Sequence, residues 1–178
     1  SILTFSNSSL LYKLQLNPYQ VYHRKQYYRI LTHGFIHANW LHLIINMLVL
    51  YSFGIAVEGY FQQYFNYPIL SYLVLYFGSM FFATITTIRK QKDNHYYNAV
   101  GASGAVSAVV FASIFFSPWS MVYFYGIIGI PGIIMGILYL LYSYYMSKKS
   151  TDNINHDAHF LGAVFGFVFP VIIDFQLI

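Results

Sequence analysis

The chain has 178 residues, of which 58% are hydrophobic, 21% aromatic and only 8% charged. A soluble domain carries about 25% charged residues, and a water-soluble fold could not cover itself with so few. Nine Lys and Arg against five acidic residues give a net charge of +4. These charges interrupt apolar runs, as loops between spans do, whereas nucleic-acid binding needs a basic face. There is no cysteine, so disulfides and thiolate metal sites are excluded.

The N-terminal part of the chain is mixed in character. It begins at Ser1 with only a few apolar residues, and we expect that most of a preceding helix is missing before residue 6. Residues 6–39 include Pro18 and are rich in Tyr, Asn and His. This composition is too polar for a membrane span and too aromatic for a plain linker. This segment is expected to be an interfacial loop with some structure.

Five apolar stretches follow, each close to the ~20 residues that cross a ~30 Å hydrocarbon core. They cover about 40–58, 68–88, 99–116, 121–146 and 157–174. The third and fifth are slightly short, which suggests a locally thin or water-penetrated site. Because no internal repeat or low-complexity segment is present, we expect a single domain over residues 1–178, of all-α class, folded as a polytopic membrane helical bundle.

Polar groups inside a span are expensive, which makes them candidates for function. The first span begins just after a run that contains His33 and His37, and it carries His42 and Asn46. At positions i and i+4, His42 and Asn46 share one face of the helix.

The third stretch opens with a serine between glycines. Ser103 follows Gly101 and precedes Gly104, and lies in the first turn of the expected helix. The amides of a first turn lack intrahelical acceptors, and the helix dipole there favours negative charge, so the Ser103 N–H would be an oxyanion donor. Helix packing is the alternative interpretation, because Gly104, Ala108 and Ala112 form a stripe of small residues.

The fifth stretch places His159, Gly162 and Gly166 on one helical face. A glycine-lined face allows close contact with the helix headed by Ser103, which would bring the imidazole near the serine hydroxyl. Alternatively, His159 is a lone histidine bonded to a carbonyl at a helix start. Taken together, the serine and histidine patterns favour a nucleophile with its base.

At these residues the chain resembles the bacterial-type rhomboid family of intramembrane serine proteases, from about Asn17 onward. The family pattern is a His and Asn in one helix, a GxSG helix start and a late AHxxG helix. Here these are His42 with Asn46, then Gly101, Ala102, Ser103 and Gly104, then Ala158, His159, Phe160, Leu161 and Gly162, followed by Gly166. The resemblance implies six spans, of which five are complete in this sequence.

The resemblance also implies roles. Ser103 would attack the scissile carbonyl of a transmembrane protein substrate, and His159 would act as general base and then acid. His42, Asn46 and the Ser103 N–H would bind the oxyanion. Asp157, two residues before His159, points about 200° around the helix and is a poor third member, so a dyad is expected.

Further residues are expected to be structural. By resemblance, Arg29 and Glu58 form a structural pair and His37 supports the interfacial loop. The glycines that would allow close helix packing are Gly101, Gly104, Gly162 and Gly166. Ser107 departs from the family, because some rhomboids carry at its position an aromatic ring that stacks on the catalytic histidine.

No metal or other cofactor is expected. His33 and His37 are four residues apart, but no acidic ligand accompanies them and HExxH is absent. The expected partners are transmembrane protein substrates and the lipid bilayer, with no nucleic acid. Two other functions compete: a catalytically inactive rhomboid relative that binds membrane clients, and a small transporter or channel subunit. The last gives no reason to combine GxSG with AHxxG.

The resemblance implies a multi-pass protein of the bacterial inner membrane with its active site towards the non-cytoplasmic side. Every Lys and Arg lies in the polar segments 6–39, 89–98 and 147–156, at that same end. The positive-inside rule would place these segments in the cytoplasm. The two criteria therefore predict opposite orientations, and we follow the family topology.

Overall fold

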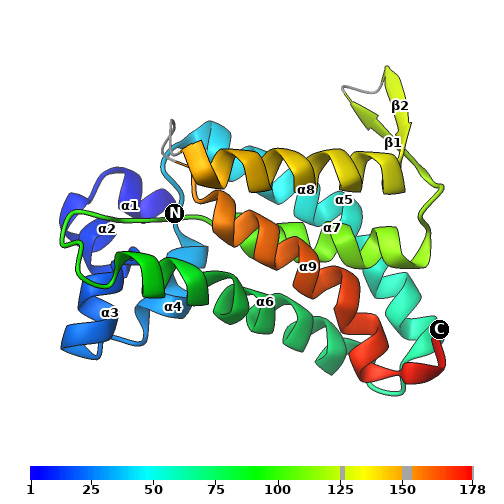
Figure 1. The fold of residues 1–178 in the computed structure, drawn as a ribbon, viewed down its shortest axis with the longest axis horizontal. Helices are drawn as coiled ribbons and strands as arrows, with labels where there is room; N and C mark the ends of the chain where they lie inside the picture. Colours follow the sequence, from blue (N-terminus) through cyan, green and yellow to red (C-terminus); the bar gives the residue numbers. More distant parts are fainter. Residues whose placement is uncertain (125–126, 150–153, 178) are drawn as a thin grey trace.

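The computed structural model describes residues 1–124, 127–149 and 154–177. Within these ranges the fold is a bundle of five long helices, preceded by a cluster of short ones (Figure 1). The long helices are α5 (Trp40–Tyr64), α6 (Pro68–Gln91), α7 (Ser103–Phe116), α8 (Gly132–Lys149) and α9 (His156–Ile173). The expected class, an all-α membrane bundle, is confirmed, with one short β-hairpin as an addition.

Short helices make up the N-terminal segment that was expected to be an interfacial loop. They are α1 (Ile2–Phe5), α2 (Ser8–Leu14), α3 (Pro18–Arg24), α4 (Arg29–Thr32) and the 3₁₀ turn η1 (His33–Phe35). Asparagine caps start two of them, because Asn7 accepts from the Leu10 amide and Asn17 from the Gln20 amide, each at 2.9 Å. Lys25, with φ of 57°, ends α3. The cluster lies beside the C-terminal end of α6 (Figure 1).

The connection from α6 to α7 is tied to this cluster. Leu16 and Ala99 exchange two backbone hydrogen bonds of 2.9 Å as an isolated antiparallel bridge. The Gly101 amide then donates to the His33 carbonyl at 2.9 Å. The backbone that leads into α7 is therefore held on both sides of residue 100.

The expected span over 121–146 was wrong at its start, because two short antiparallel strands lie there. Strand β1 (Met121–Phe124) pairs antiparallel with β2 (Ile128–Pro131), with Met121 opposite Pro131. Pro131 has no N–H, and its ring disfavours a helical backbone at the preceding Ile130. Helix α8 therefore starts only at Gly132.

Other helix ends also differ from the expected ones. Helix α5 continues to Tyr64 instead of about residue 58, because Phe61 is buried while Gln62 and Gln63 face outward. Helix α7 starts at Ser103 instead of 99, since Gly101 has φ of +113°, which is incompatible with a right-handed helix. The chain closes with a 3₁₀ turn, η2 (Phe175–Leu177).

Helix α7 is the centre of the bundle and packs against α5, α6, α8 and α9. Its residues Ala105, Ala108 and Val109 are fully buried. The main apolar core joins α7 to Phe61 of α5 and Phe169 of α9. The short helix α7 is thus enclosed by longer ones.

Three helices in the described part of the chain are long and apolar enough to cross a membrane: α5, α6 and α9. Their outward faces carry exposed large apolar side chains, such as Leu48 on α5, Leu70 on α6 and Ile172 on α9. Such surfaces are unfavourable in water and suit the hydrocarbon of a bilayer.

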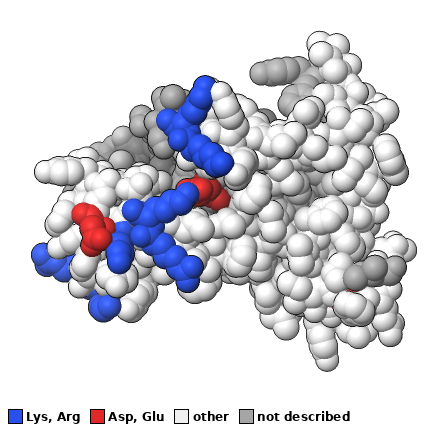
Figure 2. All heavy atoms as spheres, in the orientation of Figure 1, with Lys and Arg blue, Asp and Glu red and all other residues white. Residues whose placement is uncertain are grey.

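The basic residues gather at one end of the molecule. Figure 2 shows the Lys and Arg atoms over the half that carries α1–α4 and the end of α8, while the opposite half of this face is almost free of charge. Helices α7 and α9 begin at the charged end (Figure 1). The bundle therefore has a polar end, at which both candidate helix starts lie, and an apolar end.

Candidate active site

Glycines bring α7 and α9 into backbone contact. A Cβ added to Gly162 would overlap the Gly104 carbonyl oxygen, and one added to Gly166 would overlap the Ala108 carbonyl oxygen. On the other side, a Cβ on Gly104 would lie 3.3 Å from the Ala158 carbonyl oxygen. These glycines and alanines form a seam between the two helices with no side chain larger than a methyl group, and the seam includes the glycine-lined face predicted from the sequence.

The seam brings the starts of both helices together. Ser103 is the first residue of α7, and His159 lies in the first turn of α9. The Ser103 Oγ and the His159 Nε2 are 2.7 Å apart, a short hydrogen bond, and both residues are partly buried. When the imidazole is neutral with its proton on Nδ1, the hydroxyl donates to Nε2, which is the geometry of a nucleophile and its base.

Hydrogen-bond donors lie at the start of α7. The N-cap of α7 is Ala102, which makes no side-chain capping bond, so the first-turn amides are left for another acceptor. His42 lies against Gly101, where an added Cβ would be 2.7 Å from the ring Cε1 and 2.9 Å from Nε2. The His42 Nδ1 accepts from the Ala38 amide at 3.5 Å, which leaves the proton on Nε2, the atom facing Gly101.

Asn46 lies one turn beyond His42 and is buried, with 6% exposure. Its Nδ2 donates to the His42 carbonyl oxygen at 2.8 Å. An amide nitrogen has two hydrogens, so one N–H of Asn46 remains for a second acceptor. His42 and Asn46 thus lie on the face of α5 that points into the bundle.

A small cavity of about 20 Å³ lies beside Ser103, with walls that include Gly101, Ala105 and Ala158. This volume is enough for one water molecule. The cavity borders the free first-turn amides of α7, so a small polar atom placed in it would have backbone donors within reach.

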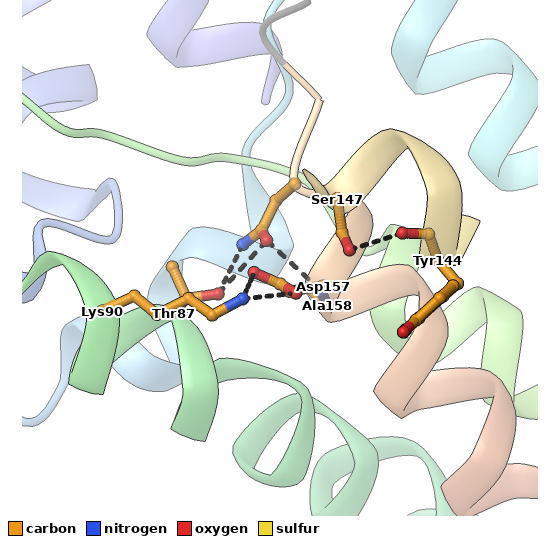
Figure 3. A network of polar contacts seen from close by, with 7 residues as sticks. Thr87, Lys90, Tyr144, Ser147, Asp157 and Ala158 are labelled. Atoms are coloured by element: carbon orange, nitrogen blue, oxygen red, sulfur yellow. Dashed lines mark hydrogen bonds and ion pairs between the residues drawn. The ribbon is translucent and has the colours of Figure 1, made fainter. Parts of the chain in front are cut away.

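A polar network holds the start of α9 against the end of α6 (Figure 3). The Asn155 Oδ1 caps α9 by accepting from the Ala158 amide at 3.2 Å, and the Asn155 side chain also bonds the Thr87 hydroxyl. Lys90 donates to both carboxylate oxygens of Asp157, at 2.9 and 2.8 Å. Asp157 therefore faces Lys90 of α6. It is not placed to orient His159 as a third catalytic residue.

Tyr139 of α8 is a residue that our sequence analysis missed. Its ring stacks on the His159 imidazole, with centroids 6.3 Å apart and planes 17° apart. Its hydroxyl shares a 2.6 Å hydrogen bond with Ser107. A signal was available, because the small residues Gly132, Gly136 and Ser143 mark the buried face of α8, and Tyr139 lies on that face.

The expected pair of Arg29 and Glu58 was wrong. Arg29 is 3% exposed, and its guanidinium donates to the carbonyl oxygens of Tyr12 and Gln15 and to the Gln26 side chain. Glu58 is exposed on α5, and no ion pair joins it to Arg29 among the described residues. Arg29 instead ties α4 to the end of α2.

His33 and His37 lie under the loop as buried groups. The His33 Nδ1 bonds the Arg29 carbonyl at 3.0 Å, and burial lowers the His33 pKa to about 4. His37 packs its ring edge-on against His42, at 4.9 Å between centroids, and burial also lowers its pKa to about 4. Within the described residues, no group of three or more His, Asp or Glu side chains is placed to hold a metal ion.

Comparison with known proteins decides the family. The sequence model of the rhomboid-domain family matches residues 24–174. This range is most of the chain and includes Ser103, His159, His42 and Asn46. The chain belongs to the rhomboid family. This confirms the family resemblance, and with the three candidate spans it makes the chain an integral membrane protein.

One curated relative of this rhomboid is "RHOMBOID-like protein 12, mitochondrial" of Arabidopsis thaliana. The two are 27% identical over 143 residues, which cover 75% of this chain and 43% of the relative. The chain thus spans less than half the length of that relative.

Proposed function

We propose that this rhomboid is an intramembrane serine endopeptidase that hydrolyses peptide bonds of transmembrane proteins through a dyad of Ser103 and His159. The observation that carries the proposal is the 2.7 Å hydrogen bond between the Ser103 Oγ and the His159 Nε2 at the polar end of an otherwise apolar bundle. A serine hydroxyl is a weak nucleophile until a base is positioned to take its proton.

The proposed reaction has two halves. In the first, the Ser103 Oγ attacks the scissile carbonyl carbon while its proton passes to the His159 Nε2. The imidazolium then gives this proton to the leaving amine, the C–N bond breaks and an acyl-enzyme forms. In the second half, His159 takes a proton from water, the resulting hydroxide equivalent attacks the ester, and the proton returns to Ser103 Oγ as the acid product leaves.

Negative charge develops on the carbonyl oxygen in both halves. The donors we assign to it are the Ser103 N–H, the His42 Nε2 and the second N–H of Asn46. The N-terminus of α7 also favours negative charge at this place. Each such donor contributes about 10² to 10³-fold to the rate.

The test is cleavage of a model transmembrane substrate by the purified chain in liposomes. Wild type is expected to cut, whereas Ser103→Ala and His159→Ala are expected to lose at least about 10²-fold in rate. Ser52→Ala is the matched control, because Ser52 is exposed on α5 and, within the described residues, its hydroxyl bonds the Leu48 carbonyl of its own helix. Unchanged cleavage by the Ser103 or His159 variant would refute the dyad.

A second measurement separates this proposal from a rhomboid that binds clients without cutting them. A fluorophosphonate probe forms a covalent bond with an activated serine and needs no substrate recognition. Mass spectrometry is expected to find the probe on Ser103 of wild type and to find none after His159→Ala. Intact wild type that neither reacts nor cleaves would favour the client-binding alternative.

The proposed orientation has the Ser103 end on the non-cytoplasmic side of the membrane. Because the chain has no cysteine, single cysteines report orientation without background. Tyr96, 92% exposed at the polar end, and Tyr67, 73% exposed at the opposite end, are suitable positions. In bacterial spheroplasts an impermeant maleimide is expected to label Tyr96→Cys and not Tyr67→Cys, and the reverse pattern would support the positive-inside orientation.

A further inference from the structure

Tyr139 contacts both helices of the proposed dyad. Its hydroxyl lies 2.6 Å from the Ser107 Oγ, one turn beyond Ser103 on α7. Its ring lies parallel to the His159 imidazole on α9, at 17° between planes. Tyr139 itself belongs to α8, so one side chain from a third helix bridges the nucleophile's helix and the base.

The two contacts constrain the ring in different ways. The hydrogen bond to Ser107, which is 7% exposed, fixes the position of the tyrosine hydroxyl, and packing of the ring against Phe111 and Ala163 restricts its rotation. The ring then lies near-parallel to the imidazole, offset from it with centroids 6.3 Å apart, which is within the range of favourable aromatic pairs. A flat wall beside His159 limits rotation of the imidazole about its side-chain torsions, and rotation would move Nε2 away from the Ser103 hydroxyl.

The position of α8 depends on a small residue one turn earlier. A Cβ on Gly136 would lie 3.2 Å from Ile114 Cδ1 and 3.4 Å from the Phe111 ring, so α8 approaches α7 closely there. This approach is what brings the Tyr139 hydroxyl within hydrogen-bond distance of Ser107. The stack on His159 is therefore a product of helix packing as well as of the two side chains.

We propose that Tyr139, anchored by Ser107, is the positioning residue that holds the His159 ring in line with the Ser103 hydroxyl. The inference rests on the proposed function, and it assigns to α8 a role in the chemistry. The polar and ring contacts of Tyr139 described above are with Ser107, Phe111 and His159, so its proposed effect is on the orientation of the base.

The first experiment compares Tyr139→Leu with Tyr139→Phe in liposomes. The leucine removes the stacked ring, and we expect kcat and the rate of fluorophosphonate labelling of Ser103 to fall about 10 to 10²-fold while KM changes less than about 2-fold. The phenylalanine keeps the ring and is expected to stay within about 5-fold of wild type. Tyr145→Leu is the matched control, since Tyr145 is exposed on the same helix, and it is expected to match wild type.

The second experiment is a double-mutant cycle that needs only mild variants. Tyr139→Phe and Ser107→Ala each remove the same hydrogen bond, so the double variant is expected to be no slower than the slower single variant. Fully additive losses would overturn the anchoring by Ser107. This cycle tests the proposal even where Tyr139→Leu does not fold.

The outcomes separate this inference from the proposed function. Wild type that does not react with the probe would overturn both. Wild type that reacts, with Tyr139→Leu equally fast or with the leucine and phenylalanine variants equally impaired, would overturn the role of the Tyr139 ring alone. A rise in KM at unchanged kcat would do the same, because it would place Tyr139 in substrate binding.

Discussion

The glycine seam between α7 and α9 allows a sharp test, in which Gly162→Ala is compared with Gly59→Ala. A methyl group at Gly162 would meet the Gly104 carbonyl oxygen, which is backbone and cannot turn aside. A methyl group at Gly59 of α5 would meet nothing within 4 Å. Both changes gain the same helix propensity, about 1 kcal/mol, so the difference between the two variants isolates the packing at the seam.

The expected difference in stability is about 1–3 kcal/mol, the usual effect of overpacking one methyl group. It is measured as the difference in free energy of unfolding, by denaturant titration in detergent micelles. Gly59→Ala is expected to be as stable as wild type or slightly more stable, and Gly162→Ala less stable than Gly59→Ala.

The same change is expected to affect activity. To make room for the methyl group at Gly162, α7 and α9 must move apart. A displacement of about 1 Å would lengthen the 2.7 Å hydrogen bond between the Ser103 Oγ and the His159 Nε2 beyond hydrogen-bond range. Misplacement of that size lowers a rate by about 10²-fold. If Gly162→Ala matched Gly59→Ala in both unfolding free energy and cleavage rate, the seam would not position the dyad.

Three further predictions concern residues around the dyad. Asn46→Ala is expected to lower the cleavage rate by about 10² to 10³-fold without abolishing it, and an unchanged rate would remove Asn46 from the oxyanion site. Asn155→Ala should destabilise the chain by about 1 kcal/mol through loss of the α9 cap, whereas Lys90→Met should change it by less than about 1 kcal/mol because Lys90 is half exposed; the reverse order in thermal unfolding would contradict this. His33 has a folded pKa of about 4 against 6.5 when unfolded, so the unfolded state binds its proton first and stability falls as pH drops from 6.5 to 4, with roughly 3 kcal/mol from His33 and a further part from His37, whose pKa is also about 4. His33→Gln should make this dependence shallower, and an equally steep loss in that variant would exclude His33 as a source.

The sequence was sufficient for the fold class and for the pairing of the helices that carry the site. Ser103 and His159 stood out because a polar group in a span is costly, and the face of Gly162 and Gly166 predicted that α9 would approach the helix headed by Ser103. Both predictions use periodicity within one helix, which the sequence shows directly.

Contacts between distant segments could not be read in the same way. The apolar run at 121–146 hid a hairpin because strands and buried helices are both hydrophobic, and only Pro131 marked the break. Arg29 was assigned to Glu58 by analogy, whereas carbonyl groups at the end of α2 bind it. The spacing of small residues along α8 could have placed Tyr139 on the buried face, but not beside His159, because that contact depends on how α8 packs against α9.

The length of α7 has a consequence for where a substrate can be cut. Its 14 residues extend about 21 Å, against a hydrocarbon thickness of ~30 Å. Trp119 follows its far end with 73% exposure, as suits a residue at a membrane interface. With that end at one boundary of the bilayer, Ser103 lies roughly 9 Å below the other, which corresponds to about six residues of a substrate helix. On the proposed function, the length of α7 sets the depth of Ser103 in the membrane. The peptide bond that is cut is then the one that lies at this depth below the membrane surface.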